Sequence, residues 1–397
     1  MGFVNEYTDS SNSYINIKGA KVSSNGYYYY GSRSLNAYVE RFDDNGNLVW
    51  AKAYNIDNSN VEIKGIIEAN GKLFCHFESK NNTNYIAGVI ALDFEGQYFW
   101  CKTFFKLSNH PHPIQNQNSR TFLSNINLIN QNIILGVRDY DSDNDSVDLY
   151  FYKISLVGAV LSQKTINDVS HQSSYFYKLE SNLIITYNNG SFIKLDENFN
   201  VIASKKINYG SSGVTSFRIL GISENTSNGY FFVHGEFLKN NSKQNFFAQI
   251  NVLTFQIQKL TYFPALTNPF FGVFIQGNNV YYSNVAIGLI KLSSSLNLVY
   301  CKNIELWNVI ADLSSIAVLG YGTSTNTRKL RYATNLELDS CKTINTTPPS
   351  FQVQTGLTFI NNSNPSLLSF SEISGNSQVA ISDINLSKEI ICGPTNP

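Results

Sequence analysis

The sequence predicts an all-β fold assembled from a repeated four-stranded unit, and three observations support this prediction. A strand-turn-strand pattern recurs along the chain, and a lysine marks the same position in seven of its copies. The residues between copies supply two further strands to each unit. No segment sustains a period of 3.6 residues over three turns, so helices are not expected.

The clearest copy of the pattern is Tyr38–Tyr54, with the sequence YVERFDDNGNLVWAKAY. Residues Ala37–Phe42 are β-prone, and Asp43–Asn47 (DDNGN) contains the Asn-Gly pair that favours a hairpin turn with positive φ. Leu48–Tyr54 then returns as the second strand. This stretch therefore predicts a β-hairpin.

Seven further segments repeat this hairpin to the end of the chain: Ile86–Phe105, Leu149–Ile166, Ser191–Ile207, Asn245–Tyr262, Ile287–Ile304, Arg328–Ile344 and Gln378–Pro394. The marker lysines are Lys52, Lys102, Lys164, Lys205, Lys259, Lys302 and Lys342, and Gly393 takes their place in the last copy. From 52 to 393 is 341 residues over seven intervals, so the mean spacing is about 49 residues. A fixed period of this size indicates a solenoid, a propeller or an array.

The residues between hairpins decide among these architectures. In the second unit, Val61–Ala69 and Leu73–Ser79 flank the turn Asn70-Gly71 and form another strand pair. Four strands per unit is the composition of one β-propeller blade. The prediction is a single β-propeller over residues 1–397, with eight blades or, as the alternative, seven. The blades are expected to end near residues 55, 106, 167, 208, 263, 305, 345 and 394, and Phe3–Tyr7 can add a strand to the last one.

The hairpin unit resembles the degenerate β-propeller repeats of bacterial surface and secreted proteins, the SBBP-type and PQQ-like units. Their consensus is close to hydrophobic-x-K-L-D-x-x-G-x-x-x-W. Trp50 and Trp100 keep the tryptophan, whereas Ser162, Ala203 and Tyr300 stand in its place in later copies. The resemblance implies an architecture and leaves the activity open, because function depends on a site and not on a fold.

Charge and hydropathy exclude several classes of partner. The chain has 29 basic and 29 acidic residues and no basic stripe, so it is not expected to bind nucleic acid or an anionic membrane. No apolar run approaches the roughly 18 residues of a membrane-spanning helix. The N-terminal MGFVNEYTDSS has neither the positively charged n-region nor the apolar h-region of a secretory signal. We expect synthesis in the cytoplasm without a signal peptide, and action in an assembled particle or at the cell exterior.

The repeat also places the cysteines. Cys101, Cys301 and Cys341 each precede a marker lysine, and Cys392 precedes Gly393, so these four occupy equivalent strands of different blades. Stacked sheets lie roughly 10 Å apart, beyond the reach of a disulfide. Cys75 lies on another strand of the second unit. Five free thiols are predicted.

One segment has the spacing of a metal site. Within Arg138–Asp148 (RDYDSDNDSVD), Asp141, Asp143 and Asp145 alternate as in D-x-D-x-D calcium loops, with Asp148 or Asp139 as a further ligand. Ser146 replaces the glycine of such loops, and no glutamate stands at the twelfth position. The hypotheses are a structural calcium ion and, as the alternative, a solvated acidic hairpin tip.

No catalytic residues and no cofactor site are predicted, because the sequence lacks a phosphate loop, G-x-S-x-G, H-E-x-x-H and C-x-x-C. The first functional hypothesis is a non-enzymatic binding or scaffold propeller that recognises a protein or a glycan receptor. It would belong to a phage tail, a contractile injection particle or a bacterial surface assembly. The alternative is a glycan hydrolase or lyase with carboxylates at the mouth of the propeller channel. A third hypothesis is a calcium-stabilised adhesin.

Overall fold

The computed structural model contains strands and turns and no helix in the part of the chain that it describes, as the sequence predicts. The described residues are 4–9, 15–45, 47–57, 59–81, 84–106, 120–141, 146–166, 174–187, 190–208, 212–265, 270–276, 278–284, 288–303, 308–311, 316–319, 344–345, 352–355, 357–361, 368–369 and 375–392. The chain divides into two compact units. Unit 1 comprises Met1–Ser170, Gly320–Thr334 and Leu367–Pro397, and unit 2 comprises His171–Leu319 and Asn335–Ser366.

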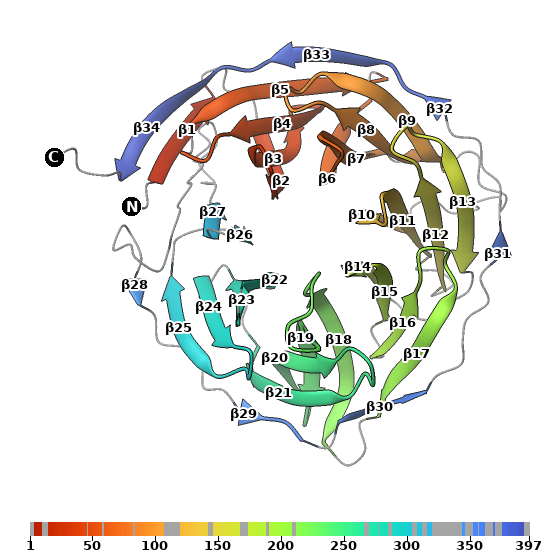
Figure 1. The fold of residues 1–397 in the computed structure, drawn as a ribbon, viewed down its shortest axis with the longest axis vertical. Coiled ribbons are helices and arrows are strands. Elements are labelled where there is room, and N and C mark those ends of the chain that lie inside the picture. Colours follow the sequence, from red (N-terminus) through yellow and green to blue (C-terminus); the bar gives the residue numbers. More distant parts are fainter. Residues whose placement is uncertain are drawn as a thin grey trace. The chain divides into compact units, whose positions relative to one another are not determined.

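Unit 1 contains three sheets, each built on four consecutive antiparallel strands (Figure 1). Blade 1 consists of β2 (Ile15–Ser23), β3 (Gly26–Arg33), β4 (Asn36–Phe42) and β5 (Leu48–Ile56). Blade 2 consists of β6 (Val61–Ala69), β7 (Lys72–Asn81), β8 (Asn84–Leu92) and β9 (Tyr98–Lys106). Blade 3 consists of β10 (Arg120–Ile129), β11 (Asn132–Asp141), β12 (Ser146–Ile154) and β13 (Val160–Ile166).

Unit 2 repeats this arrangement in three more sheets. Blade 4 consists of β14 (Ser174–Leu179), β15 (Asn182–Tyr187), β16 (Ser191–Leu195) and β17 (Val201–Asn208). Blade 5 consists of β18 (Val214–Ile222), β19 (Tyr230–Lys239), β20 (Ser242–Asn251) and β21 (Ile257–Pro264). Blade 6 consists of β22 (Phe270–Gln276), β23 (Asn279–Asn284), β24 (Gly288–Ser293) and β25 (Leu298–Asn303), and the hairpin β26 (Asn308–Ala311) and β27 (Ile316–Leu319) follows it.

The marker lysines lie on equivalent strands, as the repeat requires. Lys52, Lys102, Lys164, Lys205, Lys259 and Lys302 all fall on the fourth strand of a blade. In each blade the third and fourth strands also share a β-bulge next to the connecting turn. Lys342 lies outside the described residues, and the number of blades stays a prediction.

The core lies between neighbouring blades of a unit. In unit 1, Tyr28 and Val39 of blade 1 are fully buried and belong to one cluster with Leu73 and Ile90 of blade 2. Blades 2 and 3 share a second cluster. In unit 2, one apolar cluster lies between blades 4 and 5 and another between blades 5 and 6. Burial of such side chains contributes about 1.5–3 kcal/mol each. Each blade is therefore stabilised by the next one.

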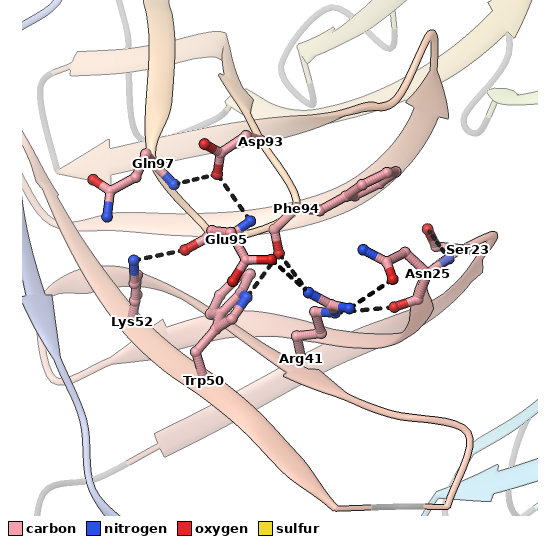
Figure 2. A network of polar contacts seen from close by, with 9 residues as sticks. All are labelled: Ser23, Asn25, Arg41, Trp50, Lys52, Asp93, Phe94, Glu95 and Gln97. Atoms are coloured by element: carbon pink, nitrogen blue, oxygen red, sulfur yellow. Dashed lines mark hydrogen bonds and ion pairs between the residues drawn. The ribbon is translucent and has the colours of Figure 1, made fainter.

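A polar clamp supplements this apolar packing between blades 1 and 2 (Figure 2). The indole nitrogen of Trp50 donates a hydrogen bond of 2.8 Å to the carbonyl oxygen of Phe94, and the ammonium of Lys52 donates one of 2.7 Å to that of Glu95. Arg41 also donates to the carbonyl oxygen of Phe94, at 3.0 Å. Both acceptors belong to the turn between β8 and β9, so strand residues of blade 1 hold the hairpin turn of blade 2.

The C-terminal part of the chain adds a fifth strand to all six blades. We call residues 344–384 the belt. Its strands are β28 (Ile344–Asn345), β29 (Gln352–Val353), β30 (Thr358–Asn361), β31 (Leu368–Ser369), β32 (Gly375–Asn376) and β33 (Val379–Asp383). In unit 1, β33, β32 and β31 pair with β5, β9 and β13, and in unit 2, β30, β29 and β28 pair with β17, β21 and β25. The belt thus passes the blades in reverse order, and Figure 1 shows β33 and β32 beside β5 and β9.

The belt corrects the prediction of a hairpin over Gln378–Pro394. The strands in this segment, β33 and β34 (Leu386–Cys392), do not pair with each other: β33 pairs with β5, and β34 pairs antiparallel with β1 (Val4–Asp9). The physical reason is that the fourth strand of blade 1 offers a row of open backbone groups, which β33 satisfies. The prediction that Phe3–Tyr7 adds a strand to the last blade holds only in part: β1 pairs with the last strand of the chain, β34, but the two form a sheet of their own.

Three cysteines confirm the prediction of free thiols. Cys75, Cys101 and Cys301 are free and buried. Desolvation raises the pKa of Cys75 and of Cys101, so both are unreactive apolar fillers. Cys341 and the side chain of Cys392 lie outside the described part of the chain, so their state stays a prediction.

Candidate binding surface

The first strands of blades 1, 2 and 3 (β2, β6 and β10) lie next to one another in unit 1. A β-bulge interrupts the first strand of blade 1 at Lys18 and that of blade 2 at Lys64. Each bulge is followed by a glycine. A Cβ on Gly65 would lie 3.0 Å from Nδ1 of His76, so the glycine lets the histidine ring pack under the strand. A bulge of this kind re-aims the side chain that it carries.

The two bulge lysines form a continuous polar network with neighbouring carboxylates. Lys18 Nζ lies 3.2 Å from Oε1 of Glu62, whose other oxygen is paired with Lys64. Lys64 Nζ also lies 3.9 Å from Oε2 of Glu78, and the backbone amide of Ser124 donates to Glu78 at 2.7 Å. The network therefore connects the first strands of three successive blades.

The two ends of this network differ in exposure. The side chain of Lys18 is 37% exposed, those of Lys64 and Glu62 are 29% and 20% exposed, and that of Glu78 is 10% exposed. The Lys18 end thus offers donors and an acceptor to solvent, and the Glu78 end is anchored in the structure. Partly exposed charged groups held in place by neighbours are suited to recognition by hydrogen bonds and ion pairs.

A buried histidine lies beneath the Lys64 bulge. His76 is 1% exposed, and desolvation, aided by the charge of Lys64, lowers its pKa to about 3. His234 occupies a similar position beside Gly221 in blade 5, where burial lowers its pKa to about 3. Both imidazoles are therefore neutral at neutral pH and act as packing groups.

A second candidate surface is apolar and repeats from blade to blade. The residue at the bulge of the fourth strand is about half exposed in five blades: Val49, Phe99 and Leu161 in unit 1, and Ile202 and Val299 in unit 2. Gln258 takes this position in blade 5. Scattered apolar residues are normal on a protein surface, but repetition at one structural position distinguishes this edge of the blades.

The predicted calcium ligands are only partly described. Asp141 ends β11, whereas Asp143 and Asp145 lie outside the described residues. The two candidate further ligands, Asp139 and Asp148, are directly opposite each other in the β11–β12 pair. Within the described ranges, no group of three or more His, Cys, Asp or Glu residues is placed to hold a metal ion. The calcium site stays a prediction.

The lysine network is absent from the residues that motif spacing predicts, although the chain carries a signal for it. The tripeptide Ile-Lys-Gly occurs at Ile17–Gly19 and again at Ile63–Gly65, and Ile-Leu-Gly stands at the matching bulge of blade 5, Ile219–Gly221. The recurrence of x-Gly on the first strand predicts a bulge with a close approach of the neighbouring strand. The identity of the bulge residue then indicates which blades present a charge.

The repeated four-stranded blades define the class of this chain, a β-propeller repeat protein. Within the described residues, no helix has the length and apolar character needed to cross a membrane. The finer resemblance to SBBP-type and PQQ-like repeats stays a prediction.

No family model and no curated protein matches the chain. Among solved structures it is similar to BamB from Moraxella catarrhalis, with 10% identity and a TM-score of 0.45 over 79% of this chain and 96% of that chain. It is also similar to the WD40 β-propeller domain of Doa1, with 11% identity and a TM-score of 0.46 over 82% and 96%. The C-terminal WD40 domain of Sif2 is similar with 10% identity and a TM-score of 0.44, over 81% of this chain and 97% of that chain.

Proposed function

We propose that this protein is a non-enzymatic binding propeller that recognises a glycan or a protein receptor. The observation that supports this proposal is the network of Lys18, Glu62 and Lys64 on the adjacent first strands of blades 1 and 2, with Glu78 on the second strand of blade 2. Its charges are balanced, partly exposed and fixed by mutual contacts. Such a surface binds polar ligands through directed hydrogen bonds.

We further propose that the protein belongs to a phage tail, a contractile injection particle or a bacterial surface assembly. In this proposal it is made in the cytoplasm without a signal peptide and acts in the assembled particle or at the cell exterior. The apolar residues at the fourth-strand bulges, Phe99 among them, would serve as contacts to other components of the assembly. Gene neighbourhood tests this part directly, because tail or baseplate genes alongside are expected.

The binding proposal is tested with a glycan array and with purified candidate receptors. Lys18→Ala removes the most exposed charge of the network without touching the apolar core. We expect a ligand of the wild-type protein to bind this variant at least about tenfold more weakly, because a charge-assisted hydrogen bond contributes about 1.5–3 kcal/mol. Lys206→Ala, at an exposed lysine of β17, is the matched control and should bind normally.

A ligand that binds Lys18→Ala and the wild type equally would remove the network as the recognition surface. Phe99→Ser then separates the two surfaces. If this variant loses a protein partner while Lys18→Ala keeps it, recognition occurs at the fourth-strand bulges. Unchanged thermal unfolding of both variants is required for either conclusion.

The second candidate function is carbohydrate hydrolysis or elimination, and one observation favours testing it: Glu62 and Glu78 lie on either side of Lys64. Glycosidases act through a pair of carboxyl groups. The test is release of reducing ends or unsaturated sugars from a polysaccharide panel. Activity that disappears in both Glu62→Gln and Glu78→Gln would establish the enzyme, and binding without turnover would exclude it.

A further inference from the structure

The belt differs from the rest of the fold in how each of its strands is held. β28, β29, β31 and β32 are two residues long, and each makes two residue pairs with its blade. β30 makes four pairs and β33 makes five. Within blade 5, by comparison, β19 and β20 are paired over ten residues.

The belt side chains whose burial is described differ in exposure, and Val379 and Ile381 of β33 are partly buried against the cluster between blades 1 and 2. Gln352, Val353, Asn376 and Ala380 are exposed, whereas Leu357 and Ile384 are buried. In blade 5 the belt makes polar contacts: Gln354 accepts a hydrogen bond of 2.8 Å from Lys239, and Gln352 accepts one of 2.6 Å from the hydroxyl of Tyr262. Segments with few buried apolar contacts and exposed backbone hydrogen bonds open locally before the protein unfolds.

The blades do not depend on the belt for their own strand pairing. Each has four consecutive strands. Among the described residues, the belt contributes none to the cluster between blades 2 and 3 and one, Leu357, to the cluster between blades 4 and 5, while Val379 and Ile381 pack at the edge of the cluster between blades 1 and 2. Opening of the belt would leave the outer edges of β5, β9 and the other fourth strands without partners at those positions. An open strand edge pairs readily with another extended chain.

We propose that the belt is exchanged between copies of this protein: after it opens, the fourth-strand edges of one copy accept the belt of a second copy. The exchanged dimer contains the same strand pairs as the monomer, so the exchange is limited by opening and by protein concentration. The belt of a second copy is the expected partner of the open edges, because the belt already pairs with the fourth strand of all six blades. This inference does not depend on the proposed function.

The test uses two single variants of the full chain. Asn55 on β5 lies directly opposite Ala380 on β33, and Cα atoms of opposite residues in a sheet are within the range of a disulfide. Asn55→Cys and Ala380→Cys are mixed at high concentration, warmed below the unfolding temperature, cooled and oxidised. Exchange predicts a covalent species of twice the 44.5 kDa chain mass in the mixture.

The controls isolate exchange from other disulfide chemistry. Each variant oxidised alone shows how much covalent dimer forms between two identical introduced cysteines or with the native cysteines. A mixture of Ala380→Cys with Asn208→Cys reports random contact, because Asn208 faces Thr358 and not residue 380. A covalent dimer no more abundant than in these controls would overturn the proposal.

Hydrogen exchange provides a second measurement. The backbone amides of β33 should exchange with solvent faster than those of β4 in the same blade, and a double variant Asn55→Cys/Ala380→Cys should lose this difference when oxidised. Equal protection of β33 and β4 in the wild type would show that the belt opens only with the blade, and the proposal would then be wrong.

Discussion

The ammonium nitrogen of Lys52 lies 2.7 Å from the carbonyl oxygen of Glu95, a residue in the hairpin turn of the next blade. The same contact recurs between Lys102 and the carbonyl oxygen of Gly158 at 3.0 Å, and between Lys259 and that of Ser295 at 2.7 Å. At these three positions, the lysine that marks the repeat in the sequence is therefore also a residue that joins one blade to the next.

This contact predicts the effect of replacing Lys52 by methionine. Methionine keeps an unbranched apolar stem but cannot donate to the turn, and Lys52 is buried. We expect Lys52→Met to lower the free energy of unfolding by about 1.5–3 kcal/mol, the usual effect of losing a hydrogen bond to a charged group. Urea unfolding measures this change.

Two lysines serve as controls for this prediction. Lys259→Met should have a smaller effect, because that lysine makes its contacts in an exposed region. Lys206→Met should be neutral within about 0.5 kcal/mol, since Lys206 is exposed. Equal losses in all three variants would contradict the clamp.

The buried histidines predict loss of stability in acid. The pKa of His76 and that of His234 are each lowered to about 3 in the folded protein, mainly by desolvation, whereas an unfolded histidine has a pKa near 6.5. Below pH 6.5 the unfolded chain therefore binds protons that the folded chain does not. Stability is fully present above pH 6.5 and is lost progressively as the pH falls toward 3.

At pH 5 the expected loss is about 2 kcal/mol for each histidine, from the pKa difference and 1.36 kcal/mol per pH unit. The measurement is urea unfolding at pH 7 and pH 5. The double variant His76→Gln/His234→Gln has no titrating group at either position, so its stability should change less between the two pH values. An identical change in wild type and double variant would argue against this origin.

The period of the repeat could be predicted from the sequence because its determinants are local. The hairpin turn at Asp43–Asn47 and the marker lysines have fixed spacings, and the fourth strands lie where that spacing places them. The belt could not be predicted. Its strand β32 consists of Gly375 and Asn376, which have low β-propensity and form a strand only because Lys102 and Thr103 offer an open edge 272 residues earlier in the chain (375 − 103).

The polar network could be predicted from the sequence only in part. The bulges at Lys18 and Lys64 follow from the repeated Ile-Lys-Gly tripeptide, which is visible in the sequence. Their connection through Glu62 and Glu78 depends on which blades are neighbours and on how far each first strand is shifted. That information is tertiary, so the candidate residues were not evident from spacing alone.

The Asp141–Asp145 loop carries a prediction that depends on the sequence alone. If it binds calcium, adding the ion should raise the unfolding temperature, because a ligand at 100 times its dissociation constant stabilises the folded state by about 2.7 kcal/mol. Asp143→Asn/Asp145→Asn should abolish the shift, and Asp44→Asn, at the acidic hairpin tip of blade 1, should preserve it. An unfolding temperature unaffected by calcium and by chelator would exclude the calcium site and favour a solvated acidic hairpin tip.

Gly235 on β19 is a position where the fold predicts a severely destabilising substitution. A Cβ at this position would lie 2.0 Å from the carbonyl oxygen of Arg218 on the neighbouring strand, so the backbone of β18 would have to move. Overpacking of this kind typically costs about 1–3 kcal/mol, and a clash with backbone falls toward the upper end. We expect Gly235→Ala to lower the free energy of unfolding accordingly.

The matched control is Gly375→Ala in the belt, where no atom lies within 4 Å of the added Cβ. Because alanine restricts the unfolded chain more than glycine does, this change should be neutral or slightly stabilising. Chemical unfolding gives the free energy of unfolding of both variants. It thus compares Gly235, where the neighbouring strand leaves no room for a Cβ, with Gly375 on an exposed edge. If the two variants were equally stable, the strand spacing in blade 5 would have to differ from that described here.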